Sequence, residues 1–293
     1  MRAPIPTQEP LLLTFVALHK HPELSFLADS ELIHSGHRHR PGWCSAVRSL
    51  FFLHNETANI YTHLGGMLVV VWILRLVLAH PAEVGLVAGC ALPVWPLIVF
   101  LCGAACCLLF SVLIHTFGTV SRATYAGLTV LDYIGISLLI FTSNVPAMRY
   151  AFLPEHPALW RLYFWLSLCV NLVAAVLGVA PFFRASSLRH LRALAYVLCG
   201  AVGAVPLLHL LWLSHGQRSG EGEVAWGLLK GTLGMGAQYV LGAALYGLRI
   251  PERWAPGRFD FFPSHSLFHI LVVTAILTHW CTMRDLHNSR CSP

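Results

Sequence analysis

Five polar side chains stand out because they occur inside segments that are otherwise apolar. Ser111 and His115 lie four residues apart in F-S-V-L-I-H-T, and His265 and His269 lie four apart in S-H-S-L-F-H-I. This spacing places both members of each pair on one face of a helix. Asp132, in L-D-Y-I-G-I, is the fifth. Ionisable groups in such segments are costly to bury unless paired, so the three histidines and Asp132 are functional candidates. Ser111 joins them because it shares a helix face with His115.

The chemistry that these residue types support is metal-assisted hydrolysis. Three neutral imidazoles can bind zinc and leave a fourth coordination position open, and such a zinc ion lowers the pKa of bound water towards about 7. The H-x-x-x-H pair resembles half of a metalloprotease H-E-x-x-H motif without its glutamate, so the base has to come from elsewhere. We predict three zinc ligands, His115, His265 and His269. We also predict Asp132 as the general base, and Ser111 as a residue that holds the substrate carbonyl or a water.

Composition shows what must position these residues. The chain has 293 residues, of which 56% are hydrophobic and 11% are charged, against roughly 25% charged residues in soluble domains. Its apolar blocks are long enough to cross a bilayer of about 30 Å as helices. The charged residues are too few to cover a soluble domain, so we predict an all-α membrane protein without a nucleic-acid partner.

The apolar blocks predict a seven-transmembrane helix bundle. The expected spans cover about 59–79, 86–119, 123–145, 159–181, 191–213, 224–248 and 264–283. Pro93 and Pro96 are expected to break the second span, so that its membrane part begins after them. We divide the chain into a cytoplasmic N-terminal segment (1–48), a membrane domain (49–283) and a short C-terminal tail (284–293).

The distribution of lysine and arginine predicts the orientation. With the N-terminus in the cytoplasm, twelve of these residues fall in inside segments and five in outside segments. The positive-inside rule therefore favours a cytoplasmic N-terminus and an outside C-terminus. In this arrangement His115 ends the second span, Asp132 lies early in the third, and the His265–His269 pair begins the seventh. All four side chains are then expected in one layer near the cytoplasmic face.

Other polar residues receive less specific interpretations. We interpret Glu56 and Asn59 as a packing network at the start of the first span. Three histidines, His209, His279 and His287, are placed towards the outer side, too far away to join the site. The chain has nine cysteines, and those inside predicted spans, Cys90 among them, are expected to be small apolar fillers. We assign no disulfides.

Four motifs in order resemble those of the progestin and adipoQ receptor family over about residues 45–285. They are S-L-F-F-L-H-N-E-T-A-N-I-Y-T-H at 49–63, Ser111-x-x-x-His115, Asp132, and P-E-R-W-A-P-G-R-F-D at 251–260 leading to His265-x-x-x-His269. The first motif and L-D-Y-I-G-I are similar to the adiponectin-receptor-like branch. The resemblance implies seven helices, a cytoplasmic N-terminus, zinc on the three histidines, and Asp132 acting through metal-bound water. It also implies ceramide hydrolysis or receptor signalling.

Two functions follow as hypotheses. The first is a zinc-dependent intramembrane lipid-amide hydrolase that acts on ceramide-like membrane lipids. The second is a membrane receptor or scaffold with a structural zinc site and no turnover, whose extracellular ligand the residues do not identify. A site of only three histidines favours the first, because a structural zinc usually has four protein ligands. A retinal protein is disfavoured because the seventh span has no lysine, and a haem protein leaves Asp132 unexplained. We expect an integral membrane protein of the plasma membrane, Golgi or endoplasmic reticulum.

Overall fold

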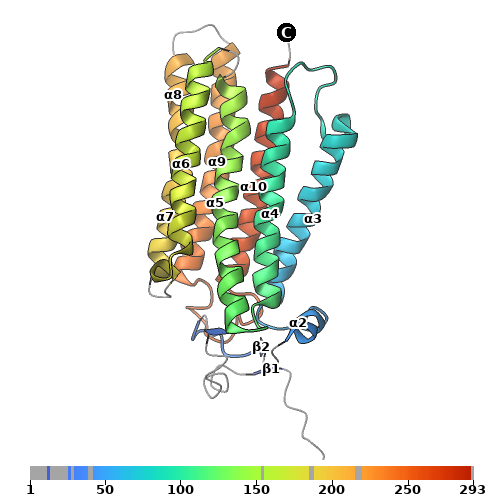
Figure 1. The fold of residues 1–293 in the computed structure, drawn as a ribbon, viewed down its shortest axis with the longest axis vertical. Coiled ribbons are helices and arrows are strands. Elements are labelled where there is room, and N and C mark those ends of the chain that lie inside the picture. Colours follow the sequence, from blue (N-terminus) through green and yellow to red (C-terminus); the bar gives the residue numbers. More distant parts are fainter. Residues whose placement is uncertain are drawn as a thin grey trace, which may run out of the picture.

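The computed structural model describes residues 12–13, 26–27, 30–38, 42–152, 155–184, 188–214 and 220–291. Figure 1 shows long helices standing side by side, with the C-terminus at one end of the bundle and β1, β2 and α2 at the other. The elements are β1 (Leu12–Leu13), β2 (His37–Arg38), α2 (Trp43–Ser49), α3 (Thr57–Ala79), η2 (Pro81–Val84), α4 (Trp95–Phe117), α5 (Arg122–Phe152), α6 (Pro157–Val179), η3 (Phe182–Arg184), α7 (Arg189–Val202), α8 (Ala204–Ser214), α9 (Gly220–Leu248) and α10 (Ser264–Ser289).

Within the described residues, six helical segments are long and apolar enough to cross a membrane. They are Thr57–Ala79, Trp95–Phe117, Arg122–Phe152, Pro157–Val179, His190–Ser214 and Ser264–Ser289. The fifth of these joins α7 and α8 into one segment. The prediction of an all-helical, multi-pass membrane protein is confirmed.

The remaining predicted span, 224–248, forms helix α9 but is not among these six. Lys230, Gln238 and many glycines lower its hydropathy. Some of those glycines have a packing role, because a Cβ atom on Gly231 would collide with Thr282 of α10. Small residues let membrane helices approach closely. The glycines that let α9 pack tightly against α10 therefore also lower its hydropathy.

The second predicted span is shorter in the structure. Helix α4 begins at Trp95 with Pro96 in its first turn, where a proline lacks only a donor that the helix would not use. The helix thus begins after Pro93, as predicted, but one residue before Pro96, which it includes in its first turn. Residues 85–94 lie in the connection from α3. At the other end of the chain, α10 continues to Ser289, beyond its predicted end at 283.

These two boundaries explain why the prediction of no disulfide is wrong. Cys90 lies in the α3–α4 connection rather than in a span, and it forms a disulfide with Cys291, which follows α10. The two residues are 201 positions apart in sequence, and their Cα atoms are 5.2 Å apart. The disulfide ties this connection to the end of α10.

The loop before α10 contains two buried carboxylates, one that bonds the first residue of the helix and one that bonds the N-terminal segment. Glu252 accepts hydrogen bonds from the backbone N–H of Ser264 (2.7 Å) and from its hydroxyl (2.5 Å). Asp260 accepts from the backbone N–H of His34 (2.9 Å) and from the Ser35 hydroxyl (2.6 Å). A carboxylate near a helix N-terminus satisfies free N–H groups and complements the helix dipole. The loop therefore sets where the histidine pair of α10 begins.

Candidate metal centre

The structure brings the three predicted metal ligands together. One nitrogen each of His115, His265 and His269 lies within 4.8 Å of the others. His115 is in the last turn of α4, whereas His265 and His269 are in the first two turns of α10. The ring centroids of His115 lie 5.0 Å from those of both partners, and the planes are steeply inclined. Three imidazole nitrogens on one zinc ion are roughly 3.3 Å apart, so a small inward movement would complete the triad.

Glu56 orients the first of these histidines. It immediately precedes α3, and its Oε2 atom lies 2.6 Å from His115 Nδ1. Because a carboxylate can only accept, Nδ1 carries the proton, and Nε2 presents its lone pair to a metal. Asn59, one helical turn further on, donates to the same oxygen at 2.7 Å.

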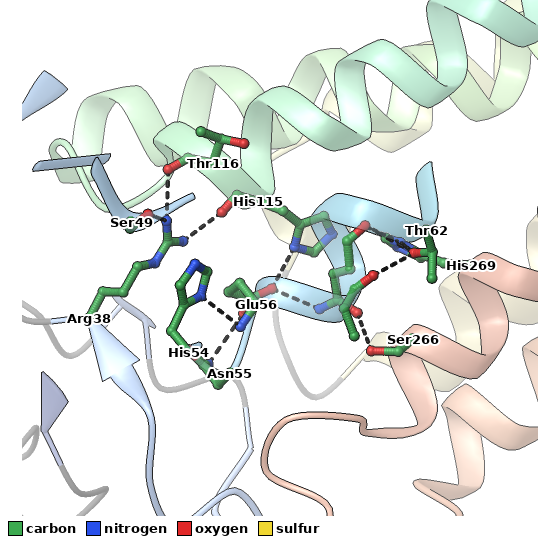
Figure 2. Close-up of polar contacts among 12 residues, drawn as sticks. Arg38, Ser49, His54, Asn55, Glu56, Thr62, His115, Thr116, Ser266 and His269 are labelled. Carbon is green, nitrogen blue, oxygen red and sulfur yellow. Dashed lines mark hydrogen bonds and ion pairs between the residues drawn. The ribbon is translucent and has the colours of Figure 1, made fainter. Parts of the chain in front are cut away.

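The backbone of Asn59 orients a second ligand. Its carbonyl oxygen lies 3.0 Å from His269 Nδ1, so the proton is again on Nδ1 and the lone pair is on Nε2. The Asn59 side-chain oxygen accepts from the Ser266 hydroxyl at 2.7 Å. Asn59 thus joins α3 to both α4 and α10 around the site. Figure 2 shows these contacts converging between the three helices.

These groups fit a divalent zinc ion. Imidazole is a preferred zinc ligand, and outer contacts that fix its tautomer raise its basicity. Burial alone would raise the pKa of Glu56, but electrostatic attraction to His115 and the hydrogen bond with it, together with the bond from Asn59, hold that pKa well below its usual range. Glu56 is therefore an anion beside the ligands and offsets part of the charge of a bound cation.

A fourth histidine, His63 of α3, packs against the triad. Its ring stacks on that of His269 with centroids 3.6 Å apart and planes 7° from parallel. His63 is 4% exposed, and within the described part of the chain neither of its ring nitrogens has a hydrogen-bond partner. It lies outside the three-histidine group. Its stacking restricts rotation of the His269 ring.

The N-terminal segment reaches the same site through Arg38 of β2. Its guanidinium donates to the carbonyl oxygens of His115 (2.5 Å) and Thr116 (2.9 Å) and to the Ser49 hydroxyl (3.0 Å). These carbonyls belong to the last turn of α4, where a cation also complements the helix dipole. Figure 2 shows these contacts of Arg38. Burial lowers the pKa of Arg38 to about 10 although Glu56 acts in the opposite direction, so the group is charged at neutral pH.

The two predicted catalytic residues lie on neighbouring helices and outside the three-histidine group. Asp132 is in α5, partly buried and within electrostatic range of His115. Ser111 is 3% exposed in α4, one turn before His115. Their roles as base and as carbonyl-holding residue stay predictions.

Sequence reasoning underestimated the first motif. Glu56 and Asn59 were expected to form a packing network, yet they contact the ligands His115 and His269. The available signal was their spacing: Asn59 and His63 are four apart and share a face of α3 with the carboxylate one turn earlier. That signal does not say which distant side chain the face meets.

Comparison with known proteins shows the family to which the chain belongs. The family model described as haemolysin-III related matches residues 51–280. The chain is 34% identical to the adiponectin receptor protein of Drosophila melanogaster over 267 residues, which are 87% of this chain and 56% of that protein. The chain belongs to the progestin and adipoQ receptor family.

Two further relatives place this family member in the adiponectin-receptor-like branch. It is 38% identical to the heptahelical transmembrane protein ADIPOR2 of rice, Oryza sativa subsp. japonica, over 69% of this chain and 86% of that protein. It is 31% identical to the ADIPOR-like receptor IZH2 of Saccharomyces cerevisiae, over 88% and 78%. The receptor of the fruit fly is longer, and the matched region spans about half of it.

Proposed function

We propose that this progestin and adipoQ receptor family member is a zinc-dependent intramembrane hydrolase of ceramide-like lipid amides. The observation that carries the proposal is the convergence of His115, His265 and His269 with a carboxylate on the outer nitrogen of His115. Three such ligands leave a coordination position for a reactant. The site is built on apolar helices, so an acyl chain in the bilayer is a chemically compatible substrate.

The proposed mechanism assigns each residue a separate task. Zinc, when bound by the three histidines, supplies Lewis-acid chemistry that acidifies water and polarises an amide carbonyl. Asp132 accepts the proton of the attacking water on its carboxylate and returns it to the nitrogen of the leaving sphingoid base. Ser111 donates its hydroxyl to the substrate carbonyl oxygen. Glu56 keeps His115 Nδ1 protonated, and the Asn59 carbonyl does the same for His269.

We further propose seven spans, with α9 crossing the membrane alongside α10. In support, the N-terminal elements and the C-terminus lie at opposite ends of the bundle, as an odd number of crossings requires (Figure 1). Disulfides persist in oxidising compartments, so the Cys90–Cys291 bond supports an outside or lumenal C-terminus. A tag on Met1 should be protected in intact cells, whereas one after Pro293 should be accessible; the reverse pattern would overturn the orientation.

In this proposal, residues 1–48 face the cytoplasm, 49–283 form the membrane domain, and 284–293 form the outer tail. The membrane is the plasma membrane or that of the Golgi or endoplasmic reticulum. Its accessible partners are the lipids of that membrane.

The experiment that tests the activity uses the purified full-length protein. Its zinc content is measured by mass spectrometry, and release of fatty acid is followed on a panel of ceramides that differ in acyl length. The proposal expects about one zinc ion per chain at the histidine triad, and hydrolysis that is lost when a chelator removes the metal. Bound zinc without hydrolysis of any lipid amide would overturn the enzyme assignment.

That outcome would favour a second candidate, a receptor whose zinc is structural. The observation in its favour is that relatives over most of this chain carry receptor names, the adiponectin receptor protein and the ADIPOR-like receptor IZH2. In a receptor of this kind, removal of zinc should lower thermal stability while no lipid is turned over.

A further inference from the structure

A second group of metal-binding side chains lies at the end of the bundle that carries the C-terminus. The proposed topology places this end outside, and we call it the outer end. Cys90 of the α3–α4 connection, His287 of α10 and Cys291 after α10 place one ligand atom each within 4.8 Å of one another. His287 is 1% exposed, and the two cysteines are partly exposed. The group lies at the opposite end of α10 from the histidine triad (Figure 1).

The distances in this group are close to those around a metal ion. His287 Nε2 lies 3.8 Å from Cys90 Sγ and 4.0 Å from Cys291 Sγ. A thiolate sulfur and an imidazole nitrogen on the same zinc ion are about 3.5 Å apart, given bond lengths of about 2.3 and 2.0 Å. Only the two sulfurs, now bonded to each other, have to separate, and side-chain rotation at each cysteine can achieve this.

The neighbours of His287 are arranged to support a ligand. Its Nδ1 atom faces Asn288 Oδ1 at 3.4 Å. That oxygen is an acceptor, because it accepts from the Val87 backbone N–H while Asn288 Nδ2 donates to the Gly85 carbonyl. A proton on Nδ1 thus has an acceptor. In the disulfide state Nε2 lies 3.3 Å from the Leu92 carbonyl oxygen, and a metal ion at the sulfurs would replace this contact and take the Nε2 lone pair. The edge of the ring packs on Tyr150, with centroids 5.2 Å apart.

We propose that Cys90, His287 and Cys291 form a second metal site, which binds zinc or a similar thiophilic ion when their disulfide is reduced. Reduction by a phosphine breaks the S–S bond and gives two electrons to the sulfurs. Two protons come from water, whose oxygen leaves as phosphine oxide. Binding of a divalent ion then releases both thiol protons and forms two metal–sulfur bonds and one metal–nitrogen bond. Soft thiolates with an imidazole favour zinc over magnesium or calcium.

Both states join the α3–α4 connection to α10. In the oxidised state the link is the covalent bond between Cys90 and Cys291, and in the reduced state it is the shared ion. Reduction therefore exchanges one cross-link for another, and the ion rather than the bond then holds the outer end together.

Cobalt distinguishes this site from the histidine triad. Cobalt bound by thiolates shows strong sulfur-to-metal charge-transfer absorption in the near ultraviolet, which a three-histidine site does not produce. The full-length protein is reduced with a phosphine, desalted without oxygen and titrated with cobalt. The oxidised protein is titrated in parallel. We expect the charge-transfer band only after reduction, and we expect zinc to displace it.

Two variants assign the band. His287→Gln leaves both cysteines, so it should form the disulfide normally, but its reduced form should bind cobalt at least about tenfold more weakly. The double change Cys90→Ser with Cys291→Ser keeps the other seven cysteines and should lose the band. Absence of the band in the reduced wild type, its persistence in the double variant, or equal affinity in His287→Gln would each overturn the proposal.

Discussion

The two ends of α10 carry two triads that differ in donor chemistry and in support. At the end that the proposed topology places inside, called the inner end, His265 and His269 meet His115, and the Nδ1 atoms of His115 and His269 contact a carboxylate and a backbone carbonyl. At the outer end, His287 meets two cysteines that are joined in a disulfide. The inner donors have no redox chemistry, so that triad is ready for a metal in any compartment. The outer triad is controlled by thiol oxidation.

The two sites have the same number of ligands. They differ in how deeply the ligands are buried and in how many hydrogen bonds from neighbouring residues hold the ligands in place. Each has three donors, but the inner one is built from helices that also share hydrogen bonds through Asn59. The outer one draws a ligand from a connecting loop. We expect the inner site to be the tighter one in the protein as isolated.

The largest expected effect comes from a variant that removes the inner triad and leaves the outer one intact. The double change His265→Ala with His269→Ala removes two of three ligands, so the purified protein should lose essentially all of its zinc. Zinc is measured by mass spectrometry on oxidised protein, in which the outer cysteines are occupied by their disulfide. His209→Ala is the control, because His209 bonds the Tyr163 hydroxyl elsewhere in the bundle. Full zinc retention in the double variant would remove the triad from the proposal.

The next effect separates metal binding from turnover. Asp132→Asn keeps all three histidines, so it should keep its zinc. It should lower ceramide hydrolysis by about 100-fold or more, because a positioned general base contributes that much. Zinc, melting temperature and hydrolysis are measured on the same sample. Loss of zinc or folding would instead make Asp132 a structural partner, and normal hydrolysis would take it out of the mechanism.

A smaller effect tests the support around the inner triad. Glu56→Gln still offers an oxygen to His115 Nδ1 but removes the negative charge, so zinc affinity should fall by about 10- to 100-fold. Competition with a chelator of known affinity measures this change. Glu83→Gln is the matched control, because Glu83 is an exposed carboxylate of η2. Equal affinities in Glu56→Gln and wild type would reduce Glu56 to a packing residue.

The smallest expected effect is a pH dependence of the free energy of unfolding that arises from His54, near the inner triad. His54 is fully buried, and its Nδ1 accepts from the Glu56 backbone N–H at 3.1 Å. Burial, with the Arg38 charge, lowers the pKa of His54 to about 4. Because the unfolded chain takes up this proton near pH 6.5 and the folded one near pH 4, stability falls as pH drops between these values. The loss is about 2 kcal/mol from pH 7 to pH 5.

His54→Asn keeps a side-chain acceptor at this position but cannot titrate. Its melting temperature should therefore decline less than that of the wild type between pH 7 and pH 5, by a few degrees. Parallel curves for the two proteins would show that His54 does not contribute. The measurement requires detergent-solubilised protein with zinc held constant.

Much of this arrangement was predictable from sequence. The i, i+4 pair in α10 and the position of His115 at the end of α4 needed only helix geometry and the order of spans. Pro96 located the start of α4. The contacts of Glu56 were not predictable, because its partner His115 is 59 residues away and a local motif does not specify the helix it faces.

The outer end was missed for a different reason. Hydropathy extended the second span over Cys90 and ended the last span before His287, so neither residue was considered as part of a pair. Helix α9 shows the opposite limit: its glycines weaken the hydropathy signal because they serve close packing with α10. The pairing of Cys90 with Cys291 and the glycine content of α9 both depend on tertiary contacts, which local composition does not reveal.

Arg38 links the inner triad to the N-terminal segment, which lies on the cytoplasmic side in the proposed topology. Its guanidinium holds the carbonyl of His115 itself, so docking of β2 and occupancy of the triad share one residue. By thermodynamic reciprocity, whatever free energy metal binding lends to docking of this strand, docking lends to metal binding. A protein that displaced the strand would thereby weaken zinc binding. The difference in zinc affinity between Arg38→Met and the wild type measures the size of that linkage.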